Sequence, residues 1–162
     1  MAVAVEIDEA LGEVGVKPEQ LVGWVEALAA SPLLQQHHHA LAGDLCIRLC
    51  DAEESRQLNA QYRAKDYPTN VLSFPGDQSI PEIELLGDLL ICLPVVRSEA
   101  SEQGKSFEHH LHHLVIHGVL HLLEYDHEDD NSANTMESIE TRLLSQAGVA
   151  DPYQITQAEL DK

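Results

Sequence analysis

Three histidines in the last third of the chain have a spacing that suits a single metal ion. His117 and His121 are four residues apart in an apolar segment, and helical residues at this spacing project from the same face about one turn apart. His127 follows after the apolar helical pattern ends near Glu124, so the chain can turn back to supply a third nitrogen. Three protein ligands with an open fourth position are typical of catalytic zinc, whereas structural zinc is usually closed by four.

The other histidines of this segment carry weaker signals. A histidine pair at i and i+4 also arises by chance, and such residues are usually solvated or packed. We expect His109, His110 and His112 to be solvated on the surface of the helix. His113 lies one turn before His117. It is either a histidine at the edge of the core, or a residue that lines the pocket or donates a hydrogen bond behind the ligands.

The spacing also resembles the H-E-x-x-H-x-x-G-x-x-H motif of the metzincin peptidases, with one important departure. The general-base glutamate of that motif would stand at position 118, where this chain has Gly118. A zinc peptidase without this carboxylate lacks its proton acceptor. The sequence therefore disfavours a peptidase.

The length and composition of the chain indicate one globular domain. Its 162 residues are 44% hydrophobic and 23% charged, which is ordinary for a single domain, and we expect one domain over residues 1–162 with an acidic tail at about 149–162. The longest apolar run, Leu89–Val96, is short and contains Pro94, so it cannot span a membrane. No Lys or Arg precedes Lys17, unlike the basic start of a secretory signal, and we expect a cytoplasmic location.

The charge is strongly acidic but unevenly distributed. A formal net charge of −19 argues against a generic nucleic-acid coat or a binder of anionic membranes, because both need a basic surface. It favours attraction to basic partners. Residues 43–75 hold five acidic and four basic residues, a net charge of −1. If any face accepts a polyanion, this segment should help to build it.

The three cysteines are expected to be reduced and buried. Cys46, Cys50 and Cys92 form no C-x-x-C pair and leave one over. In a chain without an export signal, free and packed thiols are the usual state.

Periodicity and capping residues predict the elements that must position the histidines. Strands are predicted over 2–7, 44–50, 70–74 and 86–93, and a solvated connector that contains His37–His39 over 31–43. Helices are predicted over 18–30, from a cap at Asp51 to about 65, over 94–103, from a cap at Ser106, and from Ser132 to Gly148. This order predicts an α+β domain with a small mixed four-stranded sheet, about five helices, and the metal site at the end of a central helix.

Four blocks of the chain match the motifs of one known family, in the same order. HGVLHLLEYDH (117–127) is similar to its signature H-G-x-L-H-L-x-G-Y-D-H. Leu58-Asn59, Tyr62-Arg63 and PTNVLSFP (68–75) resemble its L-N-x-x-Y-R-x-x-D-x-P-T-D-V-L-S-F-P stretch, LGD (86–88) its L-G-D-I segment, and Met136-Glu137, Glu140, Gly148 and Pro152-Tyr153 its closing helix and tail. Over about residues 44–153 the chain therefore resembles the YbeY endoribonucleases, the bacterial rRNA maturation factors.

The resemblance implies a zinc-dependent endoribonuclease specific for single strands, acting in 16S rRNA 3′-end maturation and ribosome quality control. It implies one zinc ion per chain on His117, His121 and His127, and it places Arg63 in the catalytic cleft. An Arg fork suits the charge that builds on phosphodiester oxygens; the alternative for Arg63 is a surface ion pair with Asp66. The implied partners are single-stranded rRNA, the small ribosomal subunit and basic ribosomal proteins.

Two positions depart from the family pattern. Asn70 stands where Asp is usual, so it keeps a hydrogen bond but cannot take up a proton. Glu124 stands where Gly is usual, between the second and third ligands. If this turn needs a positive φ, Glu costs about 1–2 kcal/mol there. Both departures concern activity rather than fold.

Two other functions stay open at this point. One is a ribosome-assembly factor that binds a metal and a basic ribosomal protein without cutting RNA, which the charge of −19 suits. The other is a metallopeptidase. RNA cleavage that stops when His121 is replaced would separate the nuclease from the assembly factor, and peptide hydrolysis would favour the peptidase.

Overall fold

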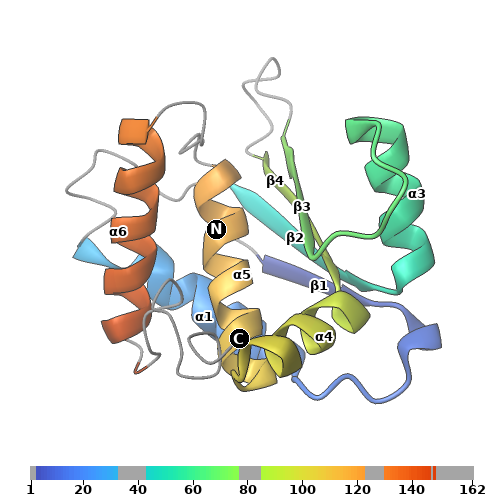
Figure 1. The fold of residues 1–162 in the computed structure, drawn as a ribbon. Helices are drawn as coiled ribbons and strands as arrows, with labels where there is room; N and C mark the ends of the chain where they lie inside the picture. The colour runs from blue at the N-terminus through green and yellow to red at the C-terminus, as the bar shows by residue number, and fades with distance from the viewer. Residues whose placement is uncertain (1–2, 33–42, 77–84, 123–129, 147, 149–162) are drawn as a thin grey trace.

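The computed structural model describes residues 3–32, 43–76, 85–122, 130–146 and 148. They form one sheet with helices on both of its faces (Figure 1). The elements, in chain order, are β1 (Val3–Ile7), the short 3-10 helix η1 (Glu9–Leu11), α1 (Pro18–Ala29), β2 (Asp44–Cys50), α3 (Ala52–Arg63), β3 (Val71–Pro75), β4 (Leu85–Cys92), α4 (Leu93–Gln103), α5 (Phe107–Leu122) and α6 (Asp130–Gln146). None of these helices is long and apolar enough to cross a membrane.

The sheet is mixed, with the strand order β1-β2-β4-β3. β1, β2 and β4 run parallel, and the edge strand β3 pairs antiparallel to β4. The predicted α+β class and four-stranded mixed sheet are confirmed. Gly87 in β4 has a φ of +149°, and a Cβ there would lie 2.4 Å from the carbonyl oxygen of Phe74. Only glycine fits this close approach, which accounts for the Gly of the LGD motif.

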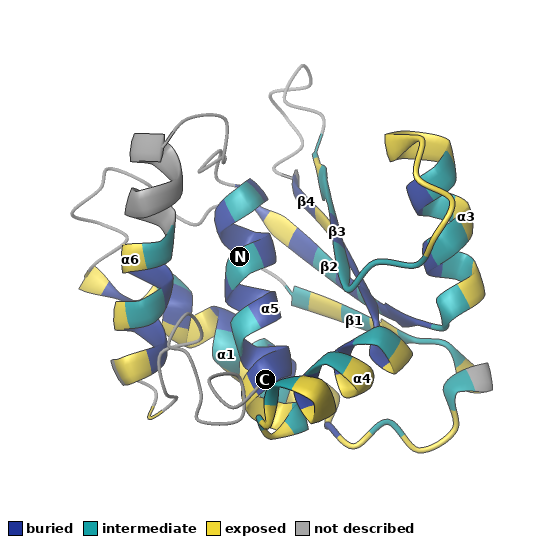
Figure 2. Ribbon diagram, in the orientation of Figure 1, coloured by how far each residue is buried: buried dark blue, intermediate teal, exposed yellow. Residues whose placement is uncertain are grey.

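The side chains of β4 alternate between two apolar clusters on opposite faces of the sheet. Leu89 and Ile91 belong to the main core, which also holds the apolar residues of α1, α5 and α6. Leu90 and Cys92 belong to a smaller cluster beneath α3. α5 therefore lies on one face of the sheet and α3 on the other (Figure 1), and α5 is buried along almost all of its length (Figure 2).

The capping residues act largely as predicted. Asp51 Oδ1 accepts from the Glu54 amide at 2.9 Å, and Ser106 Oγ accepts from the His109 amide at 3.1 Å. Glu54 does not complete a capping box, because its carboxylate pairs with Arg48 at 2.9 Å. The last helix begins at Asp130, two residues before the predicted start.

The cysteine prediction is confirmed for two of the three thiols. Cys50 and Cys92 are free and buried, and Cys46 is free and half-buried. His37–His39, Glu124, His127 and the tail at 149–162 lie outside the described residues.

Candidate metal centre on helix α5

Helix α5 packs against the sheet through Gly118, between the two histidines of the motif. A Cβ at this position would lie 2.8 Å from Leu89 Cδ2 and 3.4 Å from Val71 Cγ2. Ser73 Oγ on β3 donates to the Gly118 carbonyl at 3.2 Å. Position 118 therefore faces the sheet, where a peptidase glutamate would have no room.

His117 and His121 project from the last two turns of α5 and face each other. Their Nε2 atoms lie 3.0 Å apart, and their rings meet edge to face with centroids 4.6 Å apart. Two zinc–nitrogen bonds of about 2.1 Å at a tetrahedral centre put the nitrogens about 3.4 Å apart. The pair is thus spaced for one shared ion, and His127, the predicted third ligand, lies outside the described residues.

Glu140 of α6 is a fully buried acid that contacts two of the α5 histidines. Its Oε1 lies 2.5 Å from His117 Nδ1 and its Oε2 lies 2.9 Å from His113 Nε2, with the Glu140 side chain 0% exposed. A carboxylate accepts, so His117 Nδ1 carries the proton and its Nε2 keeps the lone pair. A carboxylate behind a metal-binding histidine commonly fixes the tautomer in this way.

His113 takes part in the site through Glu140. Burial lowers the pKa of His113, and its hydrogen bond to Glu140 opposes that effect. One ligand atom from each of His113, His117 and Glu140 lies within 4.8 Å of the others, a group that could itself hold a metal ion. His117 belongs to both arrangements, because Nδ1 faces Glu140 while Nε2 faces His121.

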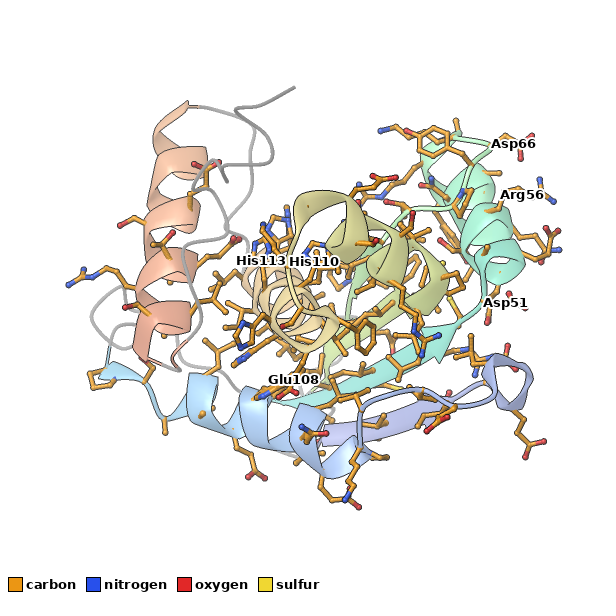
Figure 3. All side chains as sticks on the ribbon, turned by 60° about the horizontal axis from the view of Figure 1, so that its bottom comes forward. Asp51, Arg56, Asp66, Glu108, His110 and His113 are labelled. Atoms are coloured by element: carbon orange, nitrogen blue, oxygen red, sulfur yellow. The ribbon has the colours of Figure 1, made fainter. Side chains whose placement is uncertain are left out.

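The prediction that His110 and His112 are solvated is wrong, since they are 4% and 8% exposed. His110 Nε2 lies 3.1 Å from Glu99 Oε1 on α4, and its ring is near that of His113 (Figure 3). His112 stacks on Trp24 of α1 with ring centroids 4.3 Å apart. α5 is a central helix with neighbours on several sides, so polar residues off its apolar stripe are also covered. His109 is exposed, as predicted.

Asn70, the departure from the family pattern, joins the His110–Glu99 contact. Asn70 Nδ2 donates to Glu99 Oε1 at 3.0 Å, and Asn70 Oδ1 accepts from the Val71 amide at 2.7 Å. The hydrogen bonds from His110 and then Asn70 lower the pKa of Glu99, although burial opposes them. An amide matches the Glu99 carboxylate here, whereas Asp would repel it.

Arg63 is not brought into contact with the histidines. It is the exposed last residue of α3, and no interaction joins it to the histidine cluster in the part of the chain that the structure describes. The alternative ion pair with Asp66 is absent as well, because Asp66 pairs with Arg56 at 2.5 Å. These two side chains lie together at the outer side of α3 (Figure 3).

Glu140 is the residue that the sequence reasoning missed as part of the site. The apolar stripe of the last helix runs through Met136, Ile139, Leu143 and Leu144, and position 140 falls on this stripe at i+4 from Met136. An acid on a core-facing stripe needs a polar partner. That signal was present in the sequence, but nothing in it identified the partners.

Comparisons with known proteins agree with the motifs. A family model described as Endoribonuclease YbeY matches residues 6–148. An Endoribonuclease YbeY of Stenotrophomonas maltophilia is 56% identical over 115 residues, 68% of this chain and 71% of the relative. One of Pseudomonas putida is 53% identical over 129 residues, 78% and 82% of the two chains.

A solved structure agrees on the fold. The solution structure of TM1509 from Thermotoga maritima is 23% identical and covers 94% of this chain and 99% of its own, with a TM-score of 0.55. The family match spans every described strand and helix except the start of β1. With the ordered motifs and the identities above, these findings show that the chain belongs to the YbeY endoribonuclease family.

Proposed function

We propose that this protein is a zinc-dependent endoribonuclease that cleaves single-stranded RNA, with 16S rRNA as its substrate in 3′-end maturation and ribosome quality control. The observation that carries the proposal is the His117–His121 pair, with Nε2 atoms 3.0 Å apart and His117 oriented by the buried Glu140. The relatives named above are endoribonucleases by name.

Each side chain has a defined task in this proposal. His117 and His121, with His127 as the third ligand, would hold one zinc ion, which when bound would polarise the phosphoryl oxygen and activate a water. Glu140 accepts from His117 Nδ1 and so keeps the Nε2 lone pair directed away from α6. The Arg63 guanidinium stabilises negative charge on the non-bridging oxygens of the scissile phosphate.

The acidity of the chain supports a role beside the ribosome. A protein with a net charge of −19 attracts basic surfaces over the screening length of about 8 Å at physiological salt. Basic ribosomal proteins of the small subunit therefore fit as partners, and the cytoplasm fits as the location. The same acidity favours the second candidate, a metal-binding assembly factor that does not cut RNA.

Metal removal and replacement test the proposal. Chelator-treated protein should not cleave a defined single-stranded RNA, and zinc should restore cleavage of that RNA but not of its duplex. His121→Ala should stay inactive with zinc, whereas His109→Ala, an exposed histidine of the same helix, should behave as wild type.

Three results would contradict the proposal. Cleavage that survives metal removal would exclude a metal-dependent reaction. Zinc binding with no RNA cleavage would favour the assembly factor. Zinc-dependent peptide hydrolysis would favour the peptidase.

A further inference from the structure

We propose that Tyr62, Arg63, Lys65 and Tyr67, the tyrosine–cation surface, bind single-stranded RNA and lead it across the edge strand β3 toward the α5 histidines. This inference rests on the proposed function, in which Arg63 also contacts the scissile phosphate, and it adds a surface for the rest of the RNA strand. The occupant is a single strand rather than a duplex, because the surface offers aromatic faces to unpaired bases.

Both tyrosines of the surface are unusually exposed. Tyr62 is 60% exposed and Tyr67 is 53% exposed, and they are the exposed large hydrophobic side chains among the described residues. Bases of single-stranded nucleic acid stack on such rings without regard to sequence.

The cations of the tyrosine–cation surface, Arg63 and Lys65, are not paired with acids, whereas the other two arginines of residues 43–75 are. Arg48 pairs with Glu54 and Glu6, and Arg56 pairs with Glu53 and Asp66. Neither Arg63 nor Lys65 has an ion-pair partner within the residues that the structure describes.

This difference matters in a chain with a net charge of −19. Residues 62–67 carry two unpaired cations and two exposed aromatic rings, a combination complementary to a phosphate backbone that carries unpaired bases. Asp66, the acid of the same loop, pairs with Arg56 at 2.5 Å and not with either of these cations.

The loop that carries these side chains is held from beneath by buried polar groups. Asn59 Nδ2 donates to the Tyr67 carbonyl at 2.8 Å, and Ser55 Oγ donates to the Thr69 carbonyl at 2.9 Å. Asn59 and Ser55 are each 1% exposed. Ala64 turns the chain with a φ of 57°. The surface is therefore preorganised, which lowers the entropy lost on binding.

A short chain of contacts links the tyrosine–cation surface to the histidines. The Tyr62 ring meets the Phe74 ring edge-on, with centroids 5.3 Å apart. Ser73, the residue before Phe74, points to the opposite face of β3. Its hydroxyl donates to the carbonyl of Gly118, which lies between His117 and His121. The surface and the histidines thus lie on the two sides of one edge strand, and an RNA strand that crosses β3 would reach both.

Binding to the metal-free protein tests this surface separately from the chemistry. The probe is a fluorescein-labelled single-stranded oligoribonucleotide, measured by anisotropy at low salt in chelator. Tyr67→Ala should weaken binding on the order of 10-fold, the loss expected for one stacked base. Tyr67→Phe should keep wild-type affinity, because stacking needs the ring and not the hydroxyl. The Asn59 side chain donates to the backbone carbonyl of residue 67, so this hydrogen bond remains when the side chain of Tyr67 is truncated.

Matched variants and probes complete the experiment. Lys65→Ala should weaken binding and reduce its salt dependence, whereas Lys17→Ala, which removes an exposed cation at the start of α1, should change neither. A duplex of the same sequence should bind more weakly than the single strand. Tyr62→Ala should weaken binding as Tyr67→Ala does, and thermal unfolding of each variant shows whether it is folded.

The outcomes separate the surface from the proposed function. The proposed RNA-binding role of this surface is wrong if metal-free wild type binds no RNA or if Tyr67→Ala binds RNA as wild type does. It is also wrong if an acidic peptide displaces the RNA fully or if the duplex binds as tightly as the single strand. If zinc-loaded wild type fails to cleave while the ring dependence of binding holds, the nuclease proposal falls and the surface stands. If His121→Ala stops cleavage while the tyrosine variants bind normally, the surface falls and the nuclease stands.

Discussion

At the scale of single residues, Glu140 is the side chain on which the histidine geometry most depends. Its carboxylate is fully buried and contacts His117 and His113 through separate oxygens. A buried carboxyl group is costly unless hydrogen-bonded donors surround it. Glu140 therefore joins α6 to α5 and orients the ligand that both possible metal arrangements share.

Replacing Glu140 by Gln should weaken zinc binding about 10–100-fold, the usual cost of losing a partner behind a metal ligand. The amide keeps the shape of the side chain but offers an N–H in place of one acceptor oxygen. Competition with a chelating dye measures the affinity. Glu137→Gln, three residues earlier on the same helix and half-buried, is the matched control; equal zinc affinity in the two variants would remove Glu140 from the site.

Asn70, which stands where the family usually has Asp, donates to the carboxylate of Glu99. Asn70→Asp would restore the residue usual in the family, but it would bring a carboxylate to the 3.0 Å contact with Glu99. We expect about 1–3 kcal/mol lower stability at pH 7, and a smaller loss at pH 4, because protonation of either carboxyl group relieves the repulsion. Urea unfolding at the two pH values measures this difference, and an Asp variant as stable as wild type at pH 7 would show that another group separates the charges.

At the scale of elements, the approach of α5 to the sheet depends on Gly118. Gly118→Ala gains helix propensity of about 1 kcal/mol, but its Cβ would lie 2.8 Å from a buried Leu89 methyl. Overpacking of this kind costs roughly 1–3 kcal/mol, so we expect a net loss of stability. Chemical denaturation measures it, with Gly23→Ala on α1, where a Cβ meets nothing within 4 Å, as the control that should be neutral or stabilising.

The contact between α1 and α5 includes a histidine that folding keeps neutral. Burial beside Trp24 lowers the pKa of His112 from 6.5 to about 4. The folded state therefore favours the neutral form of His112. The contribution of this group to the free energy of unfolding is fully present above pH 6.5 and is lost as the pH falls toward 4. The shift corresponds to roughly 3 kcal/mol.

His112→Phe should flatten this pH dependence, because Phe keeps the stacked ring and cannot take up a proton. Free energies of unfolding at pH 7 and pH 4, in chelator, measure the effect. His109→Ala, at the exposed neighbouring position, removes a charge that also lowers the pKa of His112, so it should reduce the slope far less than His112→Phe does. Equal slopes for wild type and His112→Phe would mean that His112 titrates normally in the folded protein.

The elements themselves could be predicted from the sequence, whereas contacts between them could not. Alternation located β2, and the caps at Asp51 and Ser106 located α3 and α5, because these signals are local. The burial of His110 and His112 could not be seen, since it depends on Glu99 and Trp24, which come from other helices.

At the scale of the whole molecule, the sheet separates the two parts of the proposed active surface. The histidines lie with α5 and α6 on one face, and Arg63 ends α3 on the other (Figure 1). The motif spacing predicted that His117 and His121 come together, because one helix carries both. The relation of Arg63 to them depends on the path of the chain around β3, which no local pattern encodes.

The net charge also acts at this scale. At −19, long-range forces repel RNA, so binding depends on the short-range contacts of the near-neutral segment 43–75. Salt screens the repulsion together with the contacts. The affinity for RNA should therefore depend on salt less steeply than that of a basic RNA-binding protein.

The central claim, a zinc site on α5 served by Arg63, is tested most directly by zinc content and RNA cleavage measured on the same samples. Wild type should hold about one zinc per chain and cleave single-stranded RNA, while His121→Ala should lose both. Arg63→Ala should keep its zinc and cleave on the order of 10²–10³-fold more slowly, as expected for a lost transition-state donor. Wild type that holds no zinc yet cleaves, or Arg63→Ala that cleaves at the wild-type rate or loses its zinc, would contradict the account.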